Sequence, residues 1–392
     1  MSNNDGCVIS RSNEIKALGI PMAAPLFQVH DLLDQYQATI FSSNFALYAD
    51  LSARVMNILE ELAPRVEIYS IDEAFIDFSG IQDISKTAQH IRDQIARWVG
   101  IPTCIGIAPT KTLAKVANHL AKKTTFYKGV CVLEKSSDIE AVLKAFPIED
   151  IWGIGRRLAA RLKALGIKTA DELKQMDSRW MRQNFTVVGE RLVYELKGIS
   201  CLHLESEIQG RQSIQGSRSF SRPLTQFEDI REAVASYATR LAEKLRQHHL
   251  RTSTLVVSVC TNRFQVRNRQ YYNSILINLP TALNDDLSLI IASIQGLEAI
   301  LKPGFSYHKA GIVALELIPI TTTQLTLFDP RGEGTAKAPQ ISRAFDKLNH
   351  RYGRGTVHMA ACGARLSWKD KKSRKSPSYT TSWSELPQVL AK

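Results

Sequence analysis

The sequence has no closely spaced pair of cysteines and no long hydrophobic run. Its six cysteines are scattered over 392 residues without a CxxC motif, which argues against a zinc site and indicates reduced, buried thiols. No stretch of about 18 consecutive apolar residues occurs, so no membrane span is expected. Residues 1–6 lack the basic-then-apolar pattern of a signal peptide. We therefore expect a cytoplasmic protein without a membrane partner.

Acidic residues are scarce relative to basic ones. The chain has 50 Lys and Arg against 38 Asp and Glu, which gives a formal charge of +12 and an isoelectric point near 9.4. Hydrophobic residues make up 44% and charged residues 22%, a balance that argues against a disordered chain. The positive charge favours a polyanionic partner, but alone it does not separate DNA from RNA or from an anionic membrane surface.

The composition changes along the chain and predicts a multi-domain α+β protein. Residues 1–147 mix helices and strands, and residues 148–205 are helical around a glycine-rich turn. Residues 206–319 begin with a polar linker and then alternate strand, helix, strand, strand, helix, strand, which is typical of a small α+β domain. Residues 320–392 are interrupted by Pro and Gly and carry a basic run, so we expect an extended tail.

Asp72 and Glu73 form the sharpest local feature. Two β-rich runs, residues 65–71 and 74–78, flank them and predict a hairpin with both acids at its apex. Adjacent carboxylates repel each other unless a cation lies between them. Mg²⁺ prefers oxygen ligands and is usually held by one or two carboxylates together with substrate phosphates. The alternative interpretation is an ordinary solvated turn.

A cationic helix face is expected after the hairpin. Lys111, Lys115 and Lys122 are spaced by four and seven residues, so they share one face of a predicted helix whose other face is apolar. Such a face beside a carboxylate pair suits a triphosphate bound with metal. A solvated amphipathic helix is the alternative.

The segment IWGIGRR at residues 151–157 resembles the hairpin of a helix-hairpin-helix module. Gly153 and Gly155 allow the backbone to approach a phosphate, while Arg156 and Arg157 add charge at the start of the next helix. Such a turn grips the sugar-phosphate chain without reading its sequence. The alternative is a plain turn between two helices.

An apolar cluster lies inside the expected tail, formed by Gln324, Leu325, Leu327 and Phe328. A Leu-x-Leu-Phe cluster in an extended segment has no core of its own, and such clusters often dock into an apolar pocket of a partner. The alternative is that the cluster folds back onto the protein's own surface.

Other residues are expected to have structural roles. Thr169 and Glu172 form a capping-box pattern at a helix start. Asp77 lies within a strand and is not expected to be a third metal ligand. Trp152, Trp180 and Trp383 are expected to be core or packing residues rather than platforms on which bases stack.

Together these motifs resemble the Y-family translesion DNA polymerases. SIDEAF at residues 70–75 is similar to the palm motif of that family, and the order of the four segments matches the whole chain. SNNDGCVISR at residues 2–11 and KTLAK at residues 111–115 resemble specifically the UmuC group, which includes plasmid-borne relatives of the MucB and RumB type. The resemblance implies a right-hand polymerase fold, with the four segments as palm and fingers, helix-hairpin-helix thumb, ferredoxin-like little finger and C-terminal tail.

The resemblance also implies roles for individual residues. Asp72 would bridge two Mg²⁺ ions, and Glu73 would bind the ion that activates the primer 3′ hydroxyl in a two-metal nucleotidyl transfer. Lys122 matches the palm lysine that contacts the incoming triphosphate. Asn13 and Lys16 occupy the fingers positions that face this triphosphate, where the family commonly has Tyr and Arg.

Partners follow from the same resemblance. Primer-template DNA and deoxynucleoside triphosphates would be the substrates, and the protein would act with low fidelity in the SOS response. Residues 324–328 match the pentapeptide that binds the β sliding clamp. A cleaved UmuD-type dimer and the RecA filament are the other implied partners.

One departure from the family concerns the first residues of the sequence. In the family, a strand with the first metal-binding aspartate and an aromatic steric gate precedes the segment that here spans residues 2–6. Asp5 is no substitute, because it aligns with a turn on the fingers side. With two of three carboxylates, we expect the chain as written to have weak activity or none.

Two other functions stay open. A non-catalytic DNA-binding factor would keep the clamp motif and the helix-hairpin-helix turn, and the departure from the family favours it. A metal-dependent nuclease would use the same acid pair, but no further acid cluster or catalytic histidine occurs near Asp72. Primer extension on a lesion template separates a polymerase from both alternatives.

Overall fold

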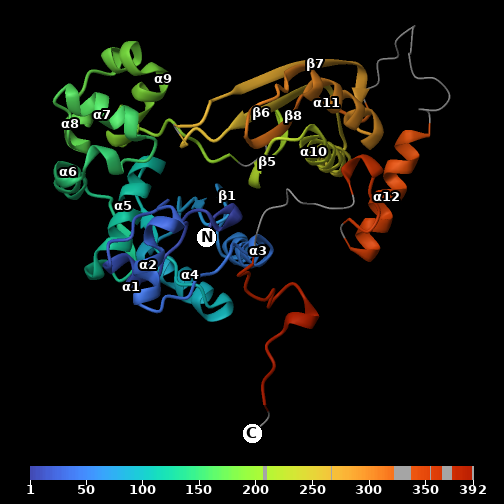
Figure 1. The fold of residues 1–392 in the computed structure, drawn as a ribbon. Helices are drawn as coiled ribbons and strands as arrows, with labels where there is room; N and C mark the ends of the chain where they lie inside the picture. The colour runs from blue at the N-terminus through green and yellow to red at the C-terminus, as the bar shows by residue number, and fades with distance from the viewer. Residues whose placement is uncertain (206–209, 266, 322–336, 354, 364–372, 391–392) are drawn as a thin grey trace. The chain divides into compact units, whose positions relative to one another are not determined.

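The computed structural model describes residues 1–392 except 206–209, 266, 322–336, 354, 364–372 and 391–392 (Figure 1). Its contacts divide the chain into two units, which are described separately. The first unit comprises Met1–Asn44 and Gln209–Ser376, and the second comprises Phe45–Ile208 and Pro377–Lys392. Within the described ranges, no helix is long and apolar enough to cross a membrane.

A four-stranded antiparallel sheet dominates the first unit. Helices α10 (Phe227–Gln247) and α11 (Asp286–Ile300) lie side by side on one face of it (Figure 1). The order strand, helix, strand, strand, helix, strand that the sequence predicts is confirmed, and the spatial order of the strands is β5-β8-β6-β7. The strands are β5 (Ile214–Leu224), β6 (Leu250–Thr261), β7 (Tyr272–Leu283) and β8 (Tyr307–Pro319).

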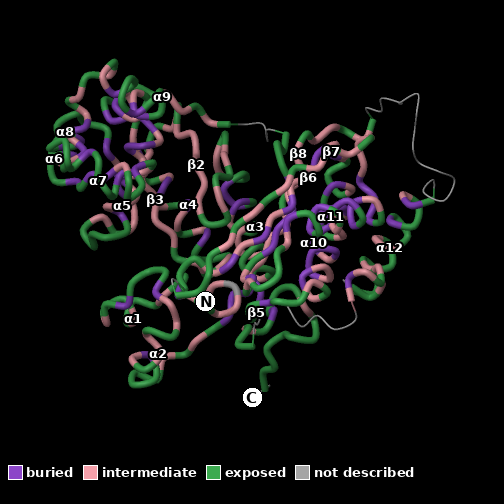
Figure 2. Tube along the Cα trace, turned by 45° about the horizontal axis from the view of Figure 1, so that its top comes forward, coloured by how far each residue is buried: buried purple, intermediate pink, exposed green. Residues whose placement is uncertain are grey.

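The core of the first unit lies between this sheet and the two helices (Figure 2). Leu255, Val257 and Val259 alternate along β6 and are all buried, because successive side chains of a strand point to opposite faces. Gly296 of α11 lies so near β7 that a β-carbon there would be 2.4 Å from Cδ1 of Ile277. A larger residue at this position would force the Ile277 side chain to move.

The C-terminal segment contains a helix that the sequence analysis missed. Helix α12 (Ala338–Tyr352) packs against α11 and begins with Pro339 in its first turn. Proline is tolerated there because the first N–H groups of a helix have no partner within the helix. The expectation of an extended chain is wrong for these residues, since a proline taken as a sign of extended structure begins a helix instead.

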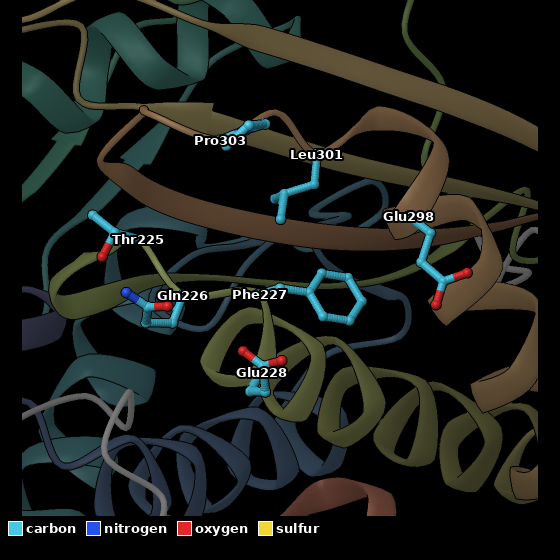
Figure 3. Close-up of a pocket in the computed structure, with 7 residues that line it drawn as sticks. All are labelled: Thr225, Gln226, Phe227, Glu228, Glu298, Leu301 and Pro303. Carbon is cyan, nitrogen blue, oxygen red and sulfur yellow. The ribbon is translucent and has the colours of Figure 1, made fainter.

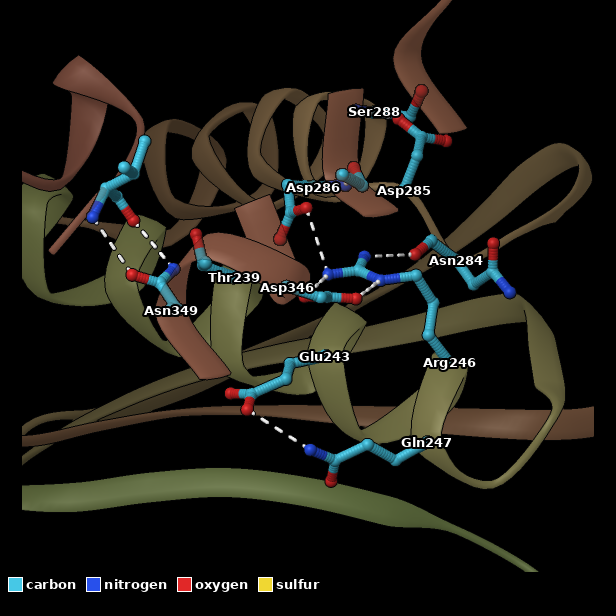
Figure 4. Close-up of polar contacts among 12 residues, drawn as sticks. Thr239, Glu243, Arg246, Gln247, Asn284, Asp285, Asp286, Ser288, Asp346 and Asn349 are labelled. Carbon is cyan, nitrogen blue, oxygen red and sulfur yellow. Dashed lines mark hydrogen bonds and ion pairs between the residues drawn. The ribbon is translucent and has the colours of Figure 1, made fainter. Parts of the chain in front are cut away.

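A partly buried ion network joins α12 to α10 and α11 (Figure 4). Arg246 of α10 donates from Nε and Nη2 to the two carboxylate oxygens of Asp346, at 2.6 and 2.7 Å, and its Nη2 lies 3.1 Å from Oδ2 of Asp286. Burial opposes the charged form of Arg246, but the hydrogen bonds that it donates to Asp346 and the charges of the two carboxylates raise its pKa overall. Burial raises the pKa of Asp286.

Two other segments of the C-terminal region contact the first unit. The 3-10 turn η4 (Ala360–Cys362) packs against α10 and buries Cys362. Ser42 and Lys375 form an isolated parallel bridge, and Nδ2 of Asn44 donates to the carbonyl of Ser376 at 3.1 Å. The C-terminal region is therefore anchored to this unit at several described places.

Residues 1–44 form a small cluster within the first unit. Its elements are the 3-10 turn η1 (Asn3–Asp5) and the helices α1 (Asn13–Ala17) and α2 (Leu26–Gln35). Val8 and Leu33 are buried in its core. This cluster is separate from the large core under the four-stranded sheet.

The second unit begins with two short sheets packed on helices. Strands β1 (Val66–Ile68) and β2 (Ala74–Ile76) pair antiparallel, whereas β3 (Ile105–Ile107) and β4 (Val130–Val132) pair parallel. The helical elements of this part are α3 (Phe45–Leu62), α4 (Ile84–Val99), α5 (Lys111–Lys123), η2 (Thr125–Tyr127) and α6 (Ser136–Ala145). The β1–β2 hairpin packs on the apolar sides of α3 and α4.

A helical subdomain follows in the same unit. Thr169 and Glu172 form the predicted capping box, in which Oγ1 of Thr169 accepts from the Glu172 N–H and the Glu172 carboxylate accepts from the Thr169 N–H. Its helices share one apolar core with α5 and α6, which includes Leu113, Leu143 and Leu162. The elements are η3 (Ile148–Asp150), α7 (Arg156–Ala164), α8 (Ala170–Lys174) and α9 (Ser178–Leu196).

The last described segment carries the turn η5 (Trp383–Glu385) and belongs to the second unit. The side chain of Trp383 is 91% exposed. The expectation that this tryptophan packs against the protein is therefore wrong. The polar residues around it, Ser382 and Ser384, hydrogen-bond to each other and supply no apolar surface.

A hollow of about 400 Å³ lies in the first unit, near the start of α10 and the end of α11 (Figure 3). Both of its charged residues, Glu228 and Glu298, are acidic, so it is unsuited to a phosphate. The acid pair predicted from the sequence belongs to the other unit. The hollow is lined by Thr225, Gln226, Phe227, Glu228, Glu298, Leu301 and Pro303.

Candidate active site

Asp72 and Glu73 lie where β1 turns into β2, so the predicted hairpin with both acids at its apex is confirmed. The backbone N–H groups of Tyr69 and Ser70 both donate to the Glu73 carbonyl, at 3.1 and 3.0 Å, and close the turn. The Ser70 hydroxyl donates to Oδ1 of Asp72 at 2.6 Å. Asp72 is exposed and the Glu73 side chain is 41% exposed, so both carboxylates are accessible to a ligand.

Of the three lysines of α5 that the sequence analysis singled out, Lys111 and Lys115 are paired with this hairpin. Nζ of Lys115 donates to Oε2 of Glu73 at 2.7 Å, and Nζ of Lys111 donates to Oε2 of Glu67 at 2.5 Å. The side chains of Lys111 and Lys115 are only 11% and 15% exposed, so a solvated helix face does not describe them. Lys122 is exposed towards the end of α5.

Gly106 and Glu195 hold α5 in place, and the sequence analysis did not single out either of them. A β-carbon on Gly106 of β3 would lie 2.0 Å from the backbone nitrogen of Asn118, so α5 lies directly on β3 because this residue is glycine. The fully buried carboxylate of Glu195 accepts from the backbone N–H of Thr112 at 3.1 Å and from that of Cys201 at 2.7 Å. A buried carboxylate near the start of a helix satisfies N–H groups that lack helical partners.

An aromatic cluster surrounds the Lys115 ammonium. Tyr69, Phe75 and Trp152 form it, with ring centroids 5.6 to 5.7 Å apart. Trp152 comes from the turn before α7, and its contacts agree with the expectation that it packs. The turn of the predicted helix-hairpin-helix is therefore in direct contact with the side chains around the acid pair.

The turn itself has the backbone that its glycines suggested. Gly153 has φ of +90°, a conformation that favours glycine, and Gly155 is the N-cap of α7. Arg156 and Arg157 follow at the start of α7, and all four residues are exposed. Their proposed contact with DNA stays a prediction.

The oxygen donors at the hairpin apex fit Mg²⁺. The two adjacent carboxylates match a site that substrate phosphates complete. Asp77, on the same hairpin, instead accepts from the Ser79 N–H at 2.9 Å, and this bonding lowers its pKa. Over the part of the chain that the structure describes, no group of three or more His, Cys, Asp or Glu is arranged to hold a metal ion.

The other residues singled out from the sequence lie elsewhere. Asn13 and Lys16 are exposed on α1 of the first unit, where Nζ of Lys16 donates to Oδ1 of Asn13 at 3.2 Å. Asp5, also in that unit, accepts from the Ser42 hydroxyl at 2.8 Å. Residues 324–328, the predicted clamp motif, lie outside the described residues.

Four family models match the chain. Residues 1–119 match the impB/mucB/samB family, residues 136–167 match its HHH motif, and residues 211–327 match its C-terminal domain. Residues 339–389 match a domain of unknown function, and this match includes most of α12.

Curated relatives align over almost the whole chain. Protein UmuC of Salmonella typhimurium is 42% identical over 99% of this chain and 93% of that protein. Protein ImpB of Salmonella typhimurium is 40% identical over 99% of this chain and 92% of that protein. Protein MucB of Escherichia coli is 35% identical over 100% of this chain and 93% of that protein.

Solved structures share the fold at low sequence identity. A Y-family DNA polymerase chimera superposes with a TM-score of 0.63 at 18% identity, covering 81% of this chain and 89% of that chain. A Dbh ternary complex with partially disordered substrates has a TM-score of 0.51 at 19% identity, covering 80% of this chain and 90% of that chain. The chain therefore belongs to the impB/mucB/samB family, among the relatives of UmuC, and has the fold of a Y-family DNA polymerase.

Proposed function

We propose that the protein is a DNA-directed DNA polymerase that copies past damaged bases with low fidelity in the SOS response. The observation that carries the proposal is the pair Asp72 and Glu73, held at a hairpin apex beside the lysines of α5. Membership of the UmuC-containing family and the Y-family fold support the same function.

The acid pair would hold Mg²⁺ together with the incoming nucleotide. Asp72 would bridge two ions, as the family resemblance implies, and its exposure and the oxygen outside its hydrogen bond with Ser70 support a role as a ligand. Glu73 would contribute a ligand on the side of the primer. When bound, two Mg²⁺ ions stabilise the attacking and leaving oxygens of an in-line displacement.

Basic residues would bind the remaining parts of the substrate. Lys122 would contact the triphosphate, as would Asn13 and Lys16 on the fingers side. The exposed turn with Gly153, Gly155, Arg156 and Arg157 would hold the sugar-phosphate backbone through its N–H groups and charges. The four-stranded domain would grip the duplex.

We propose further partners from the same family relationship. Residues 324–328, with Gln324, Leu325, Leu327 and Phe328, would bind the β sliding clamp. A cleaved UmuD-type dimer and the RecA filament would complete a cytoplasmic assembly on damaged DNA.

Primer extension on a template with an abasic site tests the proposal. We expect the full chain with Mg²⁺ and deoxynucleoside triphosphates to insert opposite the lesion, and Asp72→Ala to abolish insertion. Asp77→Asn is the matched control, since this neighbouring acid bonds to its own turn and should retain activity. Insertion that is equal in Asp72→Ala and in the unmodified chain would refute the assignment.

A second candidate is a catalytically defective protein that binds DNA and the clamp. It is favoured by a donor set of two carboxylates, with no third acid grouped with them among the described residues. Such a protein would bind primer-template and clamp normally and extend no primer. Binding measured by fluorescence anisotropy, alongside the extension assay, separates the two candidates.

A further inference from the structure

The Lys115 ammonium lies in a three-ring cage formed by Tyr69, Phe75 and Trp152. Nζ is 5.1 Å from the Tyr69 centroid, 5.2 Å from that of Phe75 and 5.6 Å from that of Trp152. The rings also contact one another edge to face or tilted. Such contacts attract a cation to the ring faces, and they offset the entropy lost by fixing a long side chain.

The cage of Tyr69, Phe75 and Trp152 holds the Lys115 ammonium beside the acid pair. Nζ of Lys115 lies 2.7 Å from Oε2 of Glu73, and its side chain is only 15% exposed. Asp72, the other acid, has a hydrogen bond from the Ser70 hydroxyl. The acid pair therefore has a counter-charge built into the fold, supplied by α5 and held by a tryptophan of the helix-hairpin-helix turn.

This counter-charge affects the binding of a free divalent cation and of a cation bound to a triphosphate in opposite ways. A divalent cation arriving alone must share Glu73 with a fixed ammonium that repels it. A cation arriving with a triphosphate brings negative charge, which the ammonium attracts. The electrostatic difference acts at close range in a partly buried site, where charges are less screened than in bulk water.

We propose that Lys115 is a positioning residue that makes metal binding at Asp72 and Glu73 depend on the nucleotide. It fixes Glu73, weakens the binding of a divalent cation alone and favours the cation together with a triphosphate. The proposal rests on the assignment of the acid pair as the metal site of the polymerase.

The chain provides a matched control in Lys111. This lysine also lies on α5, pairs with a carboxylate, Glu67, and has its Nζ 4.8 Å from the Phe75 centroid. Its partner is not one of the apical acids, and it also donates to the His203 carbonyl at 3.0 Å. Loss of Lys111 should therefore disturb packing without removing the charge beside Glu73.

The first measurement titrates the full chain with Mn²⁺ and counts the free ion by electron paramagnetic resonance, without nucleotide or DNA. We expect Lys115→Met to bind Mn²⁺ about tenfold more tightly than the unmodified chain, because a repelling charge is removed. Lys115→Arg keeps the charge and should restore weak binding. Lys111→Met should stay within about threefold of the unmodified chain.

The second measurement follows a fluorescent deoxynucleoside triphosphate by anisotropy, with saturating Ca²⁺ or with EDTA. In Lys115→Met, we expect Ca²⁺ to strengthen nucleotide binding by a factor about tenfold smaller than in the unmodified chain. Metal and nucleotide affinities are linked reciprocally, so both measurements must report the same loss of coupling. Circular dichroism checks that each variant is folded.

Specific results would overturn the proposal. Unchanged or weaker Mn²⁺ binding by folded Lys115→Met would show that the ion pair is only structural. Tightened binding that survives Glu73→Gln in the Lys115→Met background would place the metal elsewhere. Neither measurement uses primer extension, so a chain that couples metal to nucleotide but extends no primer would refute the polymerase function and leave this inference standing.

Discussion

The four-stranded sheet of the first unit and the β1–β2 hairpin of the second unit serve different purposes. Strands β5 to β8 are 11 to 13 residues long and bury one face against two helices. Strands β1 and β2 have three residues each, none of them fully buried. The hairpin nevertheless carries the acid pair at its apex, and Glu67 of β1 and Glu73 of the acid pair are each ion-paired with a lysine of α5.

The comparison indicates that the four-stranded sheet contributes mainly to stability, whereas the β1–β2 hairpin carries the groups proposed for the chemistry. Apolar burial contributes roughly 25 cal/mol per Å², so long half-buried strands stabilise a domain. Short, partly buried strands leave room for charged groups that bind ligands, and such sites gain little from burial. We expect substitutions at the hairpin apex to change activity at nearly constant stability, and substitutions in the sheet to do the reverse.

The largest expected effect is on activity. Asp72→Asn removes a charge from the proposed metal site, and we expect primer extension to fall about 10³-fold or more. The melting temperature should not change, because Asp72 is exposed and its hydrogen bonds with Ser70 lie within its own turn. If Asp72→Asn instead lowered the melting temperature in proportion to its loss of activity, the hairpin apex would contribute to stability as the four-stranded sheet does, and the contrast between the two regions would be wrong.

The second effect concerns the ion network of the first unit. Arg246→Met leaves the buried carboxylate of Asp286 without its partner, which should cost about 3–5 kcal/mol. Hydrogen exchange should rise first in α12, which Asp346 ties to Arg246. Lys347→Met, on an exposed position of α12, is the control and should leave exchange unchanged.

The third effect compares two leucines of the same sheet. Leu255→Ala on β6 removes a fully buried side chain and should destabilise the first unit by about 2–5 kcal/mol in urea unfolding. Leu276→Ala on β7, which is 56% exposed, should change stability by less than about 0.5 kcal/mol. Equal costs for both leucines would contradict the one-sided core.

The smallest effect depends on pH. The pKa of Glu172 is lowered from 4.5 by hydrogen bonds from the backbone N–H groups of Lys168 and Thr169. Its stabilisation of α8 is therefore fully present above pH 4.5 and is lost as the pH falls through the lowered value. Glu172→Gln keeps the capping hydrogen bonds but cannot titrate. In this variant, the hydrogen-exchange protection of α8 should therefore no longer fall as the pH is lowered. If protection still falls with pH as in the unmodified chain, another group causes the dependence.

Local patterns predicted much of the fold. The order of elements in the four-stranded domain, the capping box and the hairpin apex all follow from periodicity and from residues close together in sequence. Helix α12 did not, because Pro339 looks the same in an extended chain and at a helix start. The strand order β5-β8-β6-β7 also could not be read from local patterns, since it depends on long-range pairing.

The candidate site was predictable in its acids and not in their surroundings. Asp72 and Glu73 are neighbours in the sequence, so their juxtaposition needs no folding. The contacts of Trp152 with Tyr69 and of Glu195 with Thr112 join residues about 80 positions apart, and no single sequence shows which distant side chains will meet. The cage and the support of α5 therefore emerged only from the fold.

The most direct test of the central claim is a crystal of the full chain with primer-template, a non-hydrolysable deoxynucleoside triphosphate and Mn²⁺, examined for anomalous scattering. The account predicts a peak at about 2.0–2.4 Å from carboxylate oxygens of both Asp72 and Glu73, shared with phosphate oxygens of the nucleotide. Nucleotide and template bound in order, with no metal peak beside these two carboxylates, would contradict it.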